Sequence, residues 1–181
     1  MLEVEVKAQV KDKTLLEDRL STEGILLSES RTQIDHVFVK DVSSVEAFYK
    51  NAIFIRIREQ DNEAPMLTLK KKRQELASLE YETEIESTAA MSHILEQLDF
   101  VHALTIRKTR AKARHGEYTI CIDDVEGLGT FIEIEKLVED GDTKSIQSEL
   151  FAFLQSLGVT ENERVLDAYD TLLLKKKFEI I

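Results

Sequence analysis

The chain has 181 residues, 43% of them hydrophobic, and carries a formal net charge of −11. This length and composition predict a single globular domain over residues 1–181, with a core large enough to need no disulfide or zinc staple. The strong acidic balance disfavours general nucleic-acid binding, because it repels a phosphate backbone.

The cysteine count and the absence of long apolar segments bear on location. The single cysteine, Cys121, excludes an intramolecular disulfide and any cysteine-based metal cluster, and its apolar neighbours predict a small core residue. No apolar stretch reaches the length of a membrane span, and no signal-peptide core follows the N-terminus. We therefore expect a cytoplasmic protein with no membrane partner.

Hydrophobic periodicity divides the chain into strands with period two and helices with an apolar stripe. Asp12 is a candidate helix N-cap, Gly24 and Gly158 are candidate helix stops, and Thr88 is a candidate cap for a later helix. In chain order the pattern predicts a strand at Leu2–Val10, a helix at Lys13–Glu23, strands at Leu26–Val39, Ala52–Gln60, Met66–Arg73 and Leu76–Glu86, a helix from Thr88 through Leu98, strands at Val101–Ala113, Glu117–Val125 and Thr130–Val138, and helices at Thr143–Leu157 and Asp167–Lys175.

Charged residues alternate with apolar ones along these strands, and the charges are sorted by sign. Glu3 and Glu5 share one face with Lys7, whereas Arg56 and Arg58 share a face of another strand. A solvated sheet face is the usual meaning of such alternation in a single strand. A solvated face, however, gains nothing from like charges placed two residues apart, because they repel each other.

The alternation in all the strands together favours a closed barrel with charges inside. The apolar stripes of the helices must be buried against the other face of the sheet. Eight strands can close around side chains or one small ligand. We therefore predict an α+β fold, a closed eight-stranded antiparallel β-barrel with helices packed outside.

Inward-facing charges are costly unless they are paired or coordinated. Arginine and lysine bind phosphate oxygens, and carboxylates hold Mg²⁺ or Mn²⁺, which bridge to substrate phosphates. A polyphosphate with a divalent metal would satisfy both sets of charges at once.

The ordered motifs of the chain resemble those of the CYTH superfamily, the triphosphate tunnel metalloenzymes, over nearly the whole length. That group includes class IV adenylyl cyclases, thiamine triphosphatases and inorganic triphosphatases. The resemblance implies the family's eight-stranded tunnel barrel and its use of Mg²⁺ or Mn²⁺. The motifs that carry it are Glu3-Val4-Glu5-Val6-Lys7, Gln33-Ile34-Asp35-His36-Val37-Phe38, Ile55-Arg56-Ile57-Arg58, Leu67-Thr68-Leu69-Lys70, Glu80-Tyr81-Glu82, Lys108-Thr109-Arg110, Gly127 to Glu135, and Tyr169.

By this resemblance, each motif residue acquires an expected role, with structural salt bridges as the alternative. The catalytic carboxylates would be Glu80 and Glu82, as further metal ligands or as bases beside the metal. The metal ligands would be Glu3, Glu5, Glu133 and Glu135, with Asp123 as a further one. The phosphate-binding residues would be Lys7, Arg56, Arg58, Lys70, Lys108 and Arg110.

The expected function is cleavage of a metal-bound nucleoside, thiamine or inorganic triphosphate. Class IV cyclases carry a His-Phe lead before Glu-x-Glu-x-Lys, and only two residues precede Glu3 here, which favours hydrolysis. Ala168 stands where a serine often precedes the late tyrosine. Two alternatives stay open: a cyclase producing cyclic AMP and pyrophosphate, and a module that binds nucleotide or polyphosphate without turnover. The sequence leaves monomer and homodimer equally open.

Overall fold

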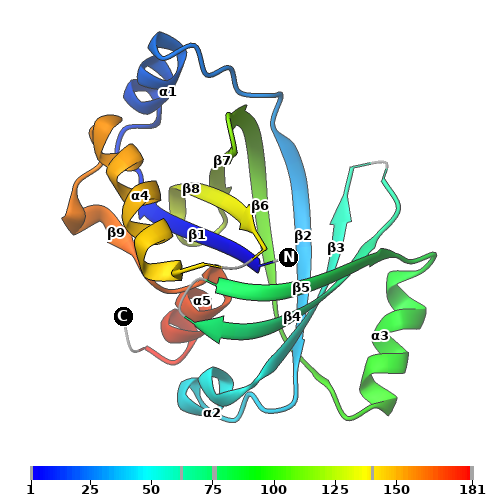
Figure 1. The fold of residues 1–181 in the computed structure, drawn as a ribbon. Coiled ribbons are helices and arrows are strands. Elements are labelled where there is room, and N and C mark those ends of the chain that lie inside the picture. The colour runs from blue at the N-terminus through cyan, green and yellow to red at the C-terminus, as the bar shows by residue number, and fades with distance from the viewer. Residues whose placement is uncertain (1, 62, 75–76, 140, 180–181) are drawn as a thin grey trace.

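The structure is a computed structural model that describes residues 2–61, 63–74, 77–139 and 141–179, except for the side chains of 72–74 and 77. Its strands pair antiparallel in the order β5-β4-β3-β2-β6-β7-β8-β1, and β5 pairs with β1 to close the barrel (Figure 1). The predicted closed eight-stranded barrel is thus confirmed. The strands are β1 Leu2–Gln9, β2 Arg31–Val39, β3 Ile53–Gln60, β4 Met66–Gln74, β5 Ala77–Glu84, β6 Val101–His115, β7 Tyr118–Val125, β8 Gly129–Val138 and β9 Arg164–Val165.

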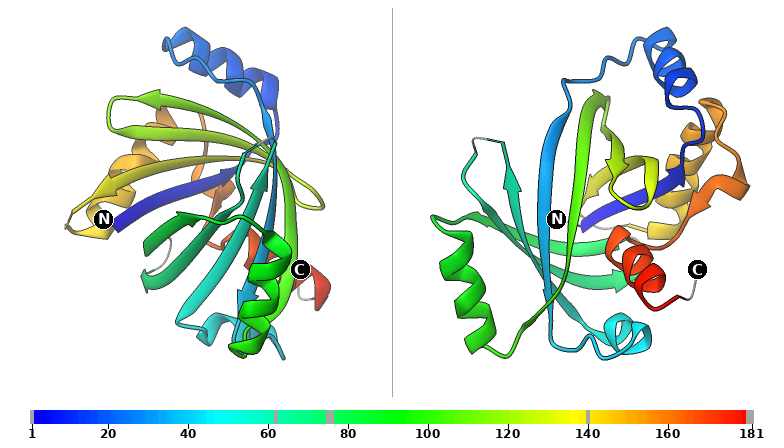
Figure 2. Two further views of the ribbon diagram at one scale, coloured as in Figure 1. Left: turned by 90° about the vertical axis from the view of Figure 1, so that its right-hand side faces the viewer. Right: turned by 180° about the vertical axis from the view of Figure 1, so that it is seen from behind.

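Helices lie on the outside of this barrel, as two further views show (Figure 2). Among the residues that the structure describes, no helix is both long and apolar enough to span a membrane. The α+β class predicted from the sequence is confirmed. The helices are α1 Lys13–Thr22, α2 Val45–Lys50, α3 Thr88–Gln97, α4 Thr143–Ser156 and α5 Tyr169–Lys177.

Several element boundaries differ from the prediction for local reasons. The cap of α3 is Ser87, whose hydroxyl accepts from the backbone N–H of Ala90, so Thr88 is the first helical residue. β2 begins at Arg31 instead of Leu26, and the predicted start of β5, Leu76, lies outside the described residues. Asp12 caps α1 as predicted, with its carboxylate 3.0 Å from the N–H of Leu15.

The sequence did not predict α2 or β9, because both are too short for a periodic pattern. α2 has six residues, and Ser44 caps it by accepting from the N–H of Ala47. Its Phe48 is 1% exposed. The helix is thus stabilised by tertiary burial, since so short a helix is marginal alone.

The apolar rows of the strands face outward and are buried under helices. The largest core cluster joins β1, β7 and β8 to α1 and α4, and includes Val4, Ile134 and Leu154, each fully buried. A second cluster lies under α3 and includes Ile57 and Leu95. Because period-two alternation turns every second residue the other way, this burial directs the charged rows into the barrel.

The seam between β1 and β5 is short. Three residue pairs join these strands, beginning with Leu2 opposite Leu79. Farther along β1, Lys7 and Ala8 pair instead with β9. The chain then reaches Tyr169 at the start of α5. The C-terminal segment therefore completes the barrel wall beside β1.

Candidate active site

The barrel encloses a cavity of about 240 Å³ that is lined mainly by charged side chains. Every residue predicted for the site lines it except Asp123, which is fully buried and is contacted by the cavity-lining Lys108 and Arg110. The predicted residues that line the cavity are Glu3, Glu5, Lys7, Arg56, Arg58, Lys70, Glu80, Glu82, Lys108, Arg110, Glu133 and Glu135. These inward positions belong to β1, β3, β4, β5, β6 and β8.

Glu3, Glu5 and Glu135 form an acidic group, with one carboxylate oxygen of each within 4.8 Å of the others. Glu5 lies directly opposite Glu135 in the β1–β8 register. Like charges in direct cross-strand opposition destabilise a sheet. The group thus has the donor set that suits a hard divalent cation, and two of its members also lie near cations: Glu5 is 3.8 Å from Lys7, and Glu135 is 3.4 Å from Arg110.

Burial raises the pKa of two of these carboxyls. The pKa of Glu5 rises from 4.5 to about 7, through burial first and the nearby Glu133 charge second. The pKa of Glu3 rises from 4.5 to about 8, again chiefly through burial, although Lys70 opposes the shift. Both groups therefore bind protons at pH values where an exposed glutamate is ionised.

We expect the metal-free protein to lose stability as the pH rises from about 5 to about 8. An acid with a raised folded-state pKa stabilises the fold below its unfolded pKa, and that contribution disappears as the pH passes the folded value. Thermal unfolding in chelator across this range should show the decline. The double variant Glu3→Gln with Glu5→Gln should lack most of it, and an equal decline in both proteins would contradict the assignment.

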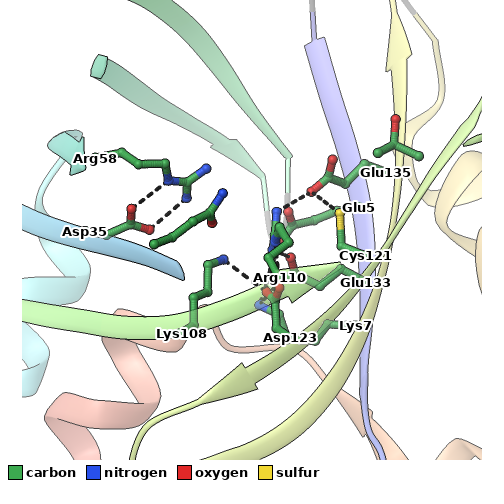
Figure 3. Close-up of polar contacts among 12 residues, drawn as sticks. Glu5, Lys7, Asp35, Arg58, Lys108, Arg110, Cys121, Asp123, Glu133 and Glu135 are labelled. Carbon is green, nitrogen blue, oxygen red and sulfur yellow. Dashed lines mark hydrogen bonds and ion pairs between the residues drawn. The ribbon is translucent and has the colours of Figure 1, made fainter. Parts of the chain in front are cut away.

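Arg110 is the centre of a buried ion-pair network (Figure 3). Its Nε donates to Asp123 at 2.6 Å, a terminal nitrogen contacts Glu133, and Nη1 lies 3.4 Å from Glu135. Lys108 Nζ donates to Asp123 at 3.0 Å. Asp123 is therefore engaged by two cations, both of which line the cavity.

Lys7 is 1% exposed and lies between an acid and an aromatic ring. Its Nζ is 3.0 Å from Glu133 and 4.0 Å from the ring centre of Tyr169. Burial alone would lower the pKa of Lys7, but the charges of Glu133 and Glu5 raise it. Burial also opposes ionisation of Glu133, yet Lys7 and Arg110 hold its pKa well below the usual range. Both side chains thus stay charged.

Lys108 differs from Lys7 in its balance of charges. Burial and the neighbouring Arg110 lower the pKa of Lys108 to about 8, although Asp123 opposes the shift. The ammonium also lies 5.1 Å from the ring centre of Tyr169. An added anion in the cavity would favour the charged form of Lys108.

A second set of pairs lines the opposite wall, formed by β2 to β5. Arg58 donates from Nε and Nη2 to the two carboxylate oxygens of Asp35, at 2.6 and 2.7 Å (Figure 3). Lys70 Nζ lies 2.6 Å from Glu80. Arg56 donates to Glu82 at 3.2 Å.

Glu80 and Glu82 each combine an ion pair with a hydroxyl donor. Ser78 donates to Glu80 at 2.7 Å, and Thr68 donates to Glu82 at 2.8 Å. Burial would raise the pKa of Glu80, but the charge of Lys70 prevails and lowers it. Glu80 is therefore an ionised acceptor at neutral pH.

The structure adds residues that the sequence analysis gave no role. Asp35 was part of a recognised motif, and its place in the inward row of β2 could have identified it. Thr68 belongs to the inward row of β4 in the same way, and it contacts Arg56 and Glu82. The sequence gave no signal for Asp170, which reaches the cavity from α5. Lys112 lines the cavity two residues beyond Arg110, at a position that alternation alone could have found.

The fold is a closed antiparallel β-barrel, and its internal cavity is lined by both acidic and basic side chains. The chain belongs to the CYTH domain family, whose match covers residues 1–169.

Individual relatives are similar over nearly their whole length. A protein of Methanocaldococcus jannaschii named "putative adenylate cyclase" is 28% identical in sequence. The alignment covers 93% of this chain and 97% of that protein. The solved structure of the PH1819 protein from Pyrococcus horikoshii has a TM-score of 0.78 at 29% identity, covering 96% of this chain and 99% of that one.

A more distant structure shares the fold alone. It is a protein from Hippeastrum named "putative adenylyl cyclase", with a TM-score of 0.65 at 20% identity, covering 97% of this chain and 95% of that one. It is described as revealing a dominant triphosphatase activity.

Proposed function

We propose that this chain is a metal-dependent enzyme that hydrolyses a P–O–P bond of a triphosphate. The observation that carries the proposal is the meeting of an acidic group and several cations in one cavity. A triphosphate with a divalent cation complements both sets, since the cation neutralises the carboxylates and the phosphates neutralise the cations. Membership of the CYTH family supports a triphosphate as substrate.

Glu3, Glu5 and Glu135 would hold Mg²⁺ or Mn²⁺. Their oxygens are hard donors, and the pKa values of Glu3 and Glu5 are raised chiefly because both carboxyls are buried. When bound, the ion would supply charge neutralisation to the phosphates and lower the pKa of a bound water. Glu133 and Asp123, expected as ligands from the sequence, would instead hold Lys7, Lys108 and Arg110 in position.

Arg56, Arg58 and Lys70 would bind phosphate oxygens from the opposite wall. Arg56 is the best placed, because its buried Nε has no hydrogen-bond partner in the described part of the chain. A buried donor without an acceptor is costly, and a phosphate oxygen would remove that cost. Lys7 on β1, with Lys108 and Arg110 on β6, would bind phosphate oxygens from the facing wall.

Glu80 and Glu82 would orient the attacking water. An ionised carboxylate can accept a hydrogen bond from water and hold it for in-line attack on phosphorus. The lowered pKa of Glu80 keeps it ionised, so Glu80 is better suited to orient the water than to accept a proton from it.

A cyclase is the second candidate, and the aromatic lining favours hydrolysis over it. Cyclisation needs a ribose hydroxyl aligned with phosphorus, which requires the nucleoside to be held. The two aromatic rings at the cavity are already engaged: Phe54 packs edge-on against Phe48, and Tyr169 against Phe131. The Hippeastrum protein is an example that supports this preference, because it is named "putative adenylyl cyclase" and reveals a dominant triphosphatase activity.

Product analysis separates the candidates. The protein is incubated with tripolyphosphate, ATP and thiamine triphosphate, each with Mg²⁺ or Mn²⁺, and the products are resolved by chromatography. Release of inorganic phosphate supports the proposed hydrolysis. Formation of cyclic AMP with pyrophosphate would instead show that the protein is a cyclase. Binding by calorimetry without any product would leave a non-catalytic binding module.

Arg56 gives a sharper test of the phosphate-binding wall. We expect Arg56→Ala to weaken tripolyphosphate binding by about 1.5–3 kcal/mol, the usual cost of a lost charged hydrogen bond. Arg56→Lys should lose less, because it keeps the charge but not the planar fork. Calorimetric titration measures both variants against the wild type. Equal affinities in all three proteins would remove Arg56 from the site.

The proposal extends to the setting of the enzyme. We place the whole chain in one domain, with a small-molecule triphosphate as its partner. We also propose a cytoplasmic location, acting as a monomer or a homodimer, without a membrane or a general nucleic-acid partner. The free Cys121 thiol is consistent with a reducing compartment.

A further inference from the structure

The inward row of β6 carries more cations than the family motif covers. β6 runs over 15 residues, and its register with β7 is regular from Lys108 to His115. Lys108 and Arg110 are therefore followed on the same face by Lys112 and then Arg114. Lys108 and Arg110 are buried, whereas Lys112 and Arg114 are exposed. The row thus leads from the tunnel interior to solvent.

Among the residues that the structure describes, Lys112 differs from the other cations that line the cavity in having no acidic partner. Lys7, Arg58, Lys70, Lys108, Arg110 and Arg56 each form an ion pair with at least one carboxylate. The ammonium of Lys112 forms neither an ion pair nor a hydrogen bond with any residue that the structure describes, although it lines the same cavity. Its charge is therefore available to a ligand without first breaking a contact.

Lys112 also lies close to the acidic group. It is directly opposite Cys121 in the β6–β7 register, and the Cys121 sulfur lies 3.9 Å from a carboxylate oxygen of Glu135. Burial raises the pKa of the Cys121 thiol, and the Lys112 charge is close enough to oppose that shift. A phosphate chain bound through a metal ion at Glu3, Glu5 and Glu135 would therefore lie near this cation.

The charge of the whole protein gives Lys112 a further effect. A chain of net charge −11 repels a polyanion at long range, while ions screen that repulsion beyond about 8 Å at physiological salt. An unpaired cation at the mouth of a cavity raises the local concentration of an anionic ligand.

We propose that Lys112 is a further substrate-binding residue, which binds an outer phosphate of the triphosphate where the tunnel opens to solvent. The proposal rests on the proposed function, since it needs a triphosphate in the tunnel. The proposal adds to the phosphate-binding residues one that lies outside the Lys108-Thr109-Arg110 motif. Because the side chain is unpaired and exposed, its contribution is to affinity and capture, with less effect on the chemical step.

The test compares Lys112→Ala with Lys71→Ala. Lys71 is an exposed lysine on β4 that faces away from the cavity, so its replacement makes the same change in charge and composition. We expect Lys112→Ala to weaken tripolyphosphate binding about three- to tenfold, less than for a buried charged hydrogen bond because the site is exposed. KM should rise more than kcat falls, Lys112→Arg should restore most of the affinity, and Lys71→Ala should match the wild type.

Salt dependence gives a second readout. The logarithm of tripolyphosphate affinity should fall less steeply with the logarithm of salt concentration in Lys112→Ala than in Lys71→Ala, because one fewer cation contacts the anion. A structural role alone would not change this slope.

The outcomes separate the two proposals. If the wild type binds and hydrolyses tripolyphosphate while Lys112→Ala and Lys71→Ala behave alike, the inference about Lys112 is overturned and the proposed function stands. If the wild type neither binds nor hydrolyses any triphosphate, both are overturned.

Discussion

Replacing Glu3 and Glu5 together by glutamine should lower metal-dependent turnover at least ~10²-fold while the fold stays intact. Metal neutralisation of phosphate charge contributes several kcal/mol, and each 1.36 kcal/mol corresponds to a tenfold change in rate. The two carboxylates lie with Glu135 in the acidic group, so their removal leaves one acidic ligand there. Rates at increasing Mn²⁺ or Mg²⁺ and metal titration by calorimetry measure the loss.

The same variant should be at least as stable as the wild type in chelator at pH 8. Two raised pKa values mean that ionisation of these groups opposes folding at that pH. The matched control is Glu23→Gln with Glu86→Gln, which removes equal charge from exposed positions and should leave turnover unchanged. Wild-type activity in the double variant of the acidic group would rule out its role as the metal site.

Arg110→Met should destabilise the protein by about 3–5 kcal/mol at pH 7, the usual cost of removing one partner from a buried ion pair. Asp123 and Glu133 would lose their shared guanidinium, and both are buried, at 0% and 4% exposure. Lys7 and Lys108 would remain to offset part of the cost. Urea unfolding monitored by circular dichroism measures the change.

Arg107→Met is the matched control, because Arg107 is an exposed residue of the same strand that faces outside the barrel. It should change the free energy of unfolding by no more than about 0.5 kcal/mol. Adding Asp123→Asn to Arg110→Met should recover part of the loss, since it removes one negative charge from a network that has lost one positive charge. Should Arg110→Met prove too unstable to purify, Arg110→Lys provides a milder test. A loss below about 1 kcal/mol in Arg110→Met would mean that water reaches the network and that it is not buried.

The sequence by itself determined the wall of this barrel and its two faces. Period-two alternation in segments such as Glu3 to Lys7 assigns each side chain to one face, and the helices between strands require the apolar face to be outside. The sign sorting of the inward rows then predicted a tunnel for a polyanion and a cation. These features are local, so they could be read without knowing which strands are neighbours.

Only the tertiary structure decided which charges meet. Glu5 opposes Glu135 because β1 pairs with β8, and this pairing brings the carboxylates of the acidic group together. Asp123 and Glu133 carry the same charge, yet they lie beside Arg110 and form its ion pairs. Within the described part of the chain Lys112 has no ion-pair partner, and its cross-strand neighbour on β7 is the uncharged Cys121. The physical reason is that strand order and register place residues distant in sequence side by side, and a charge takes its role from those neighbours.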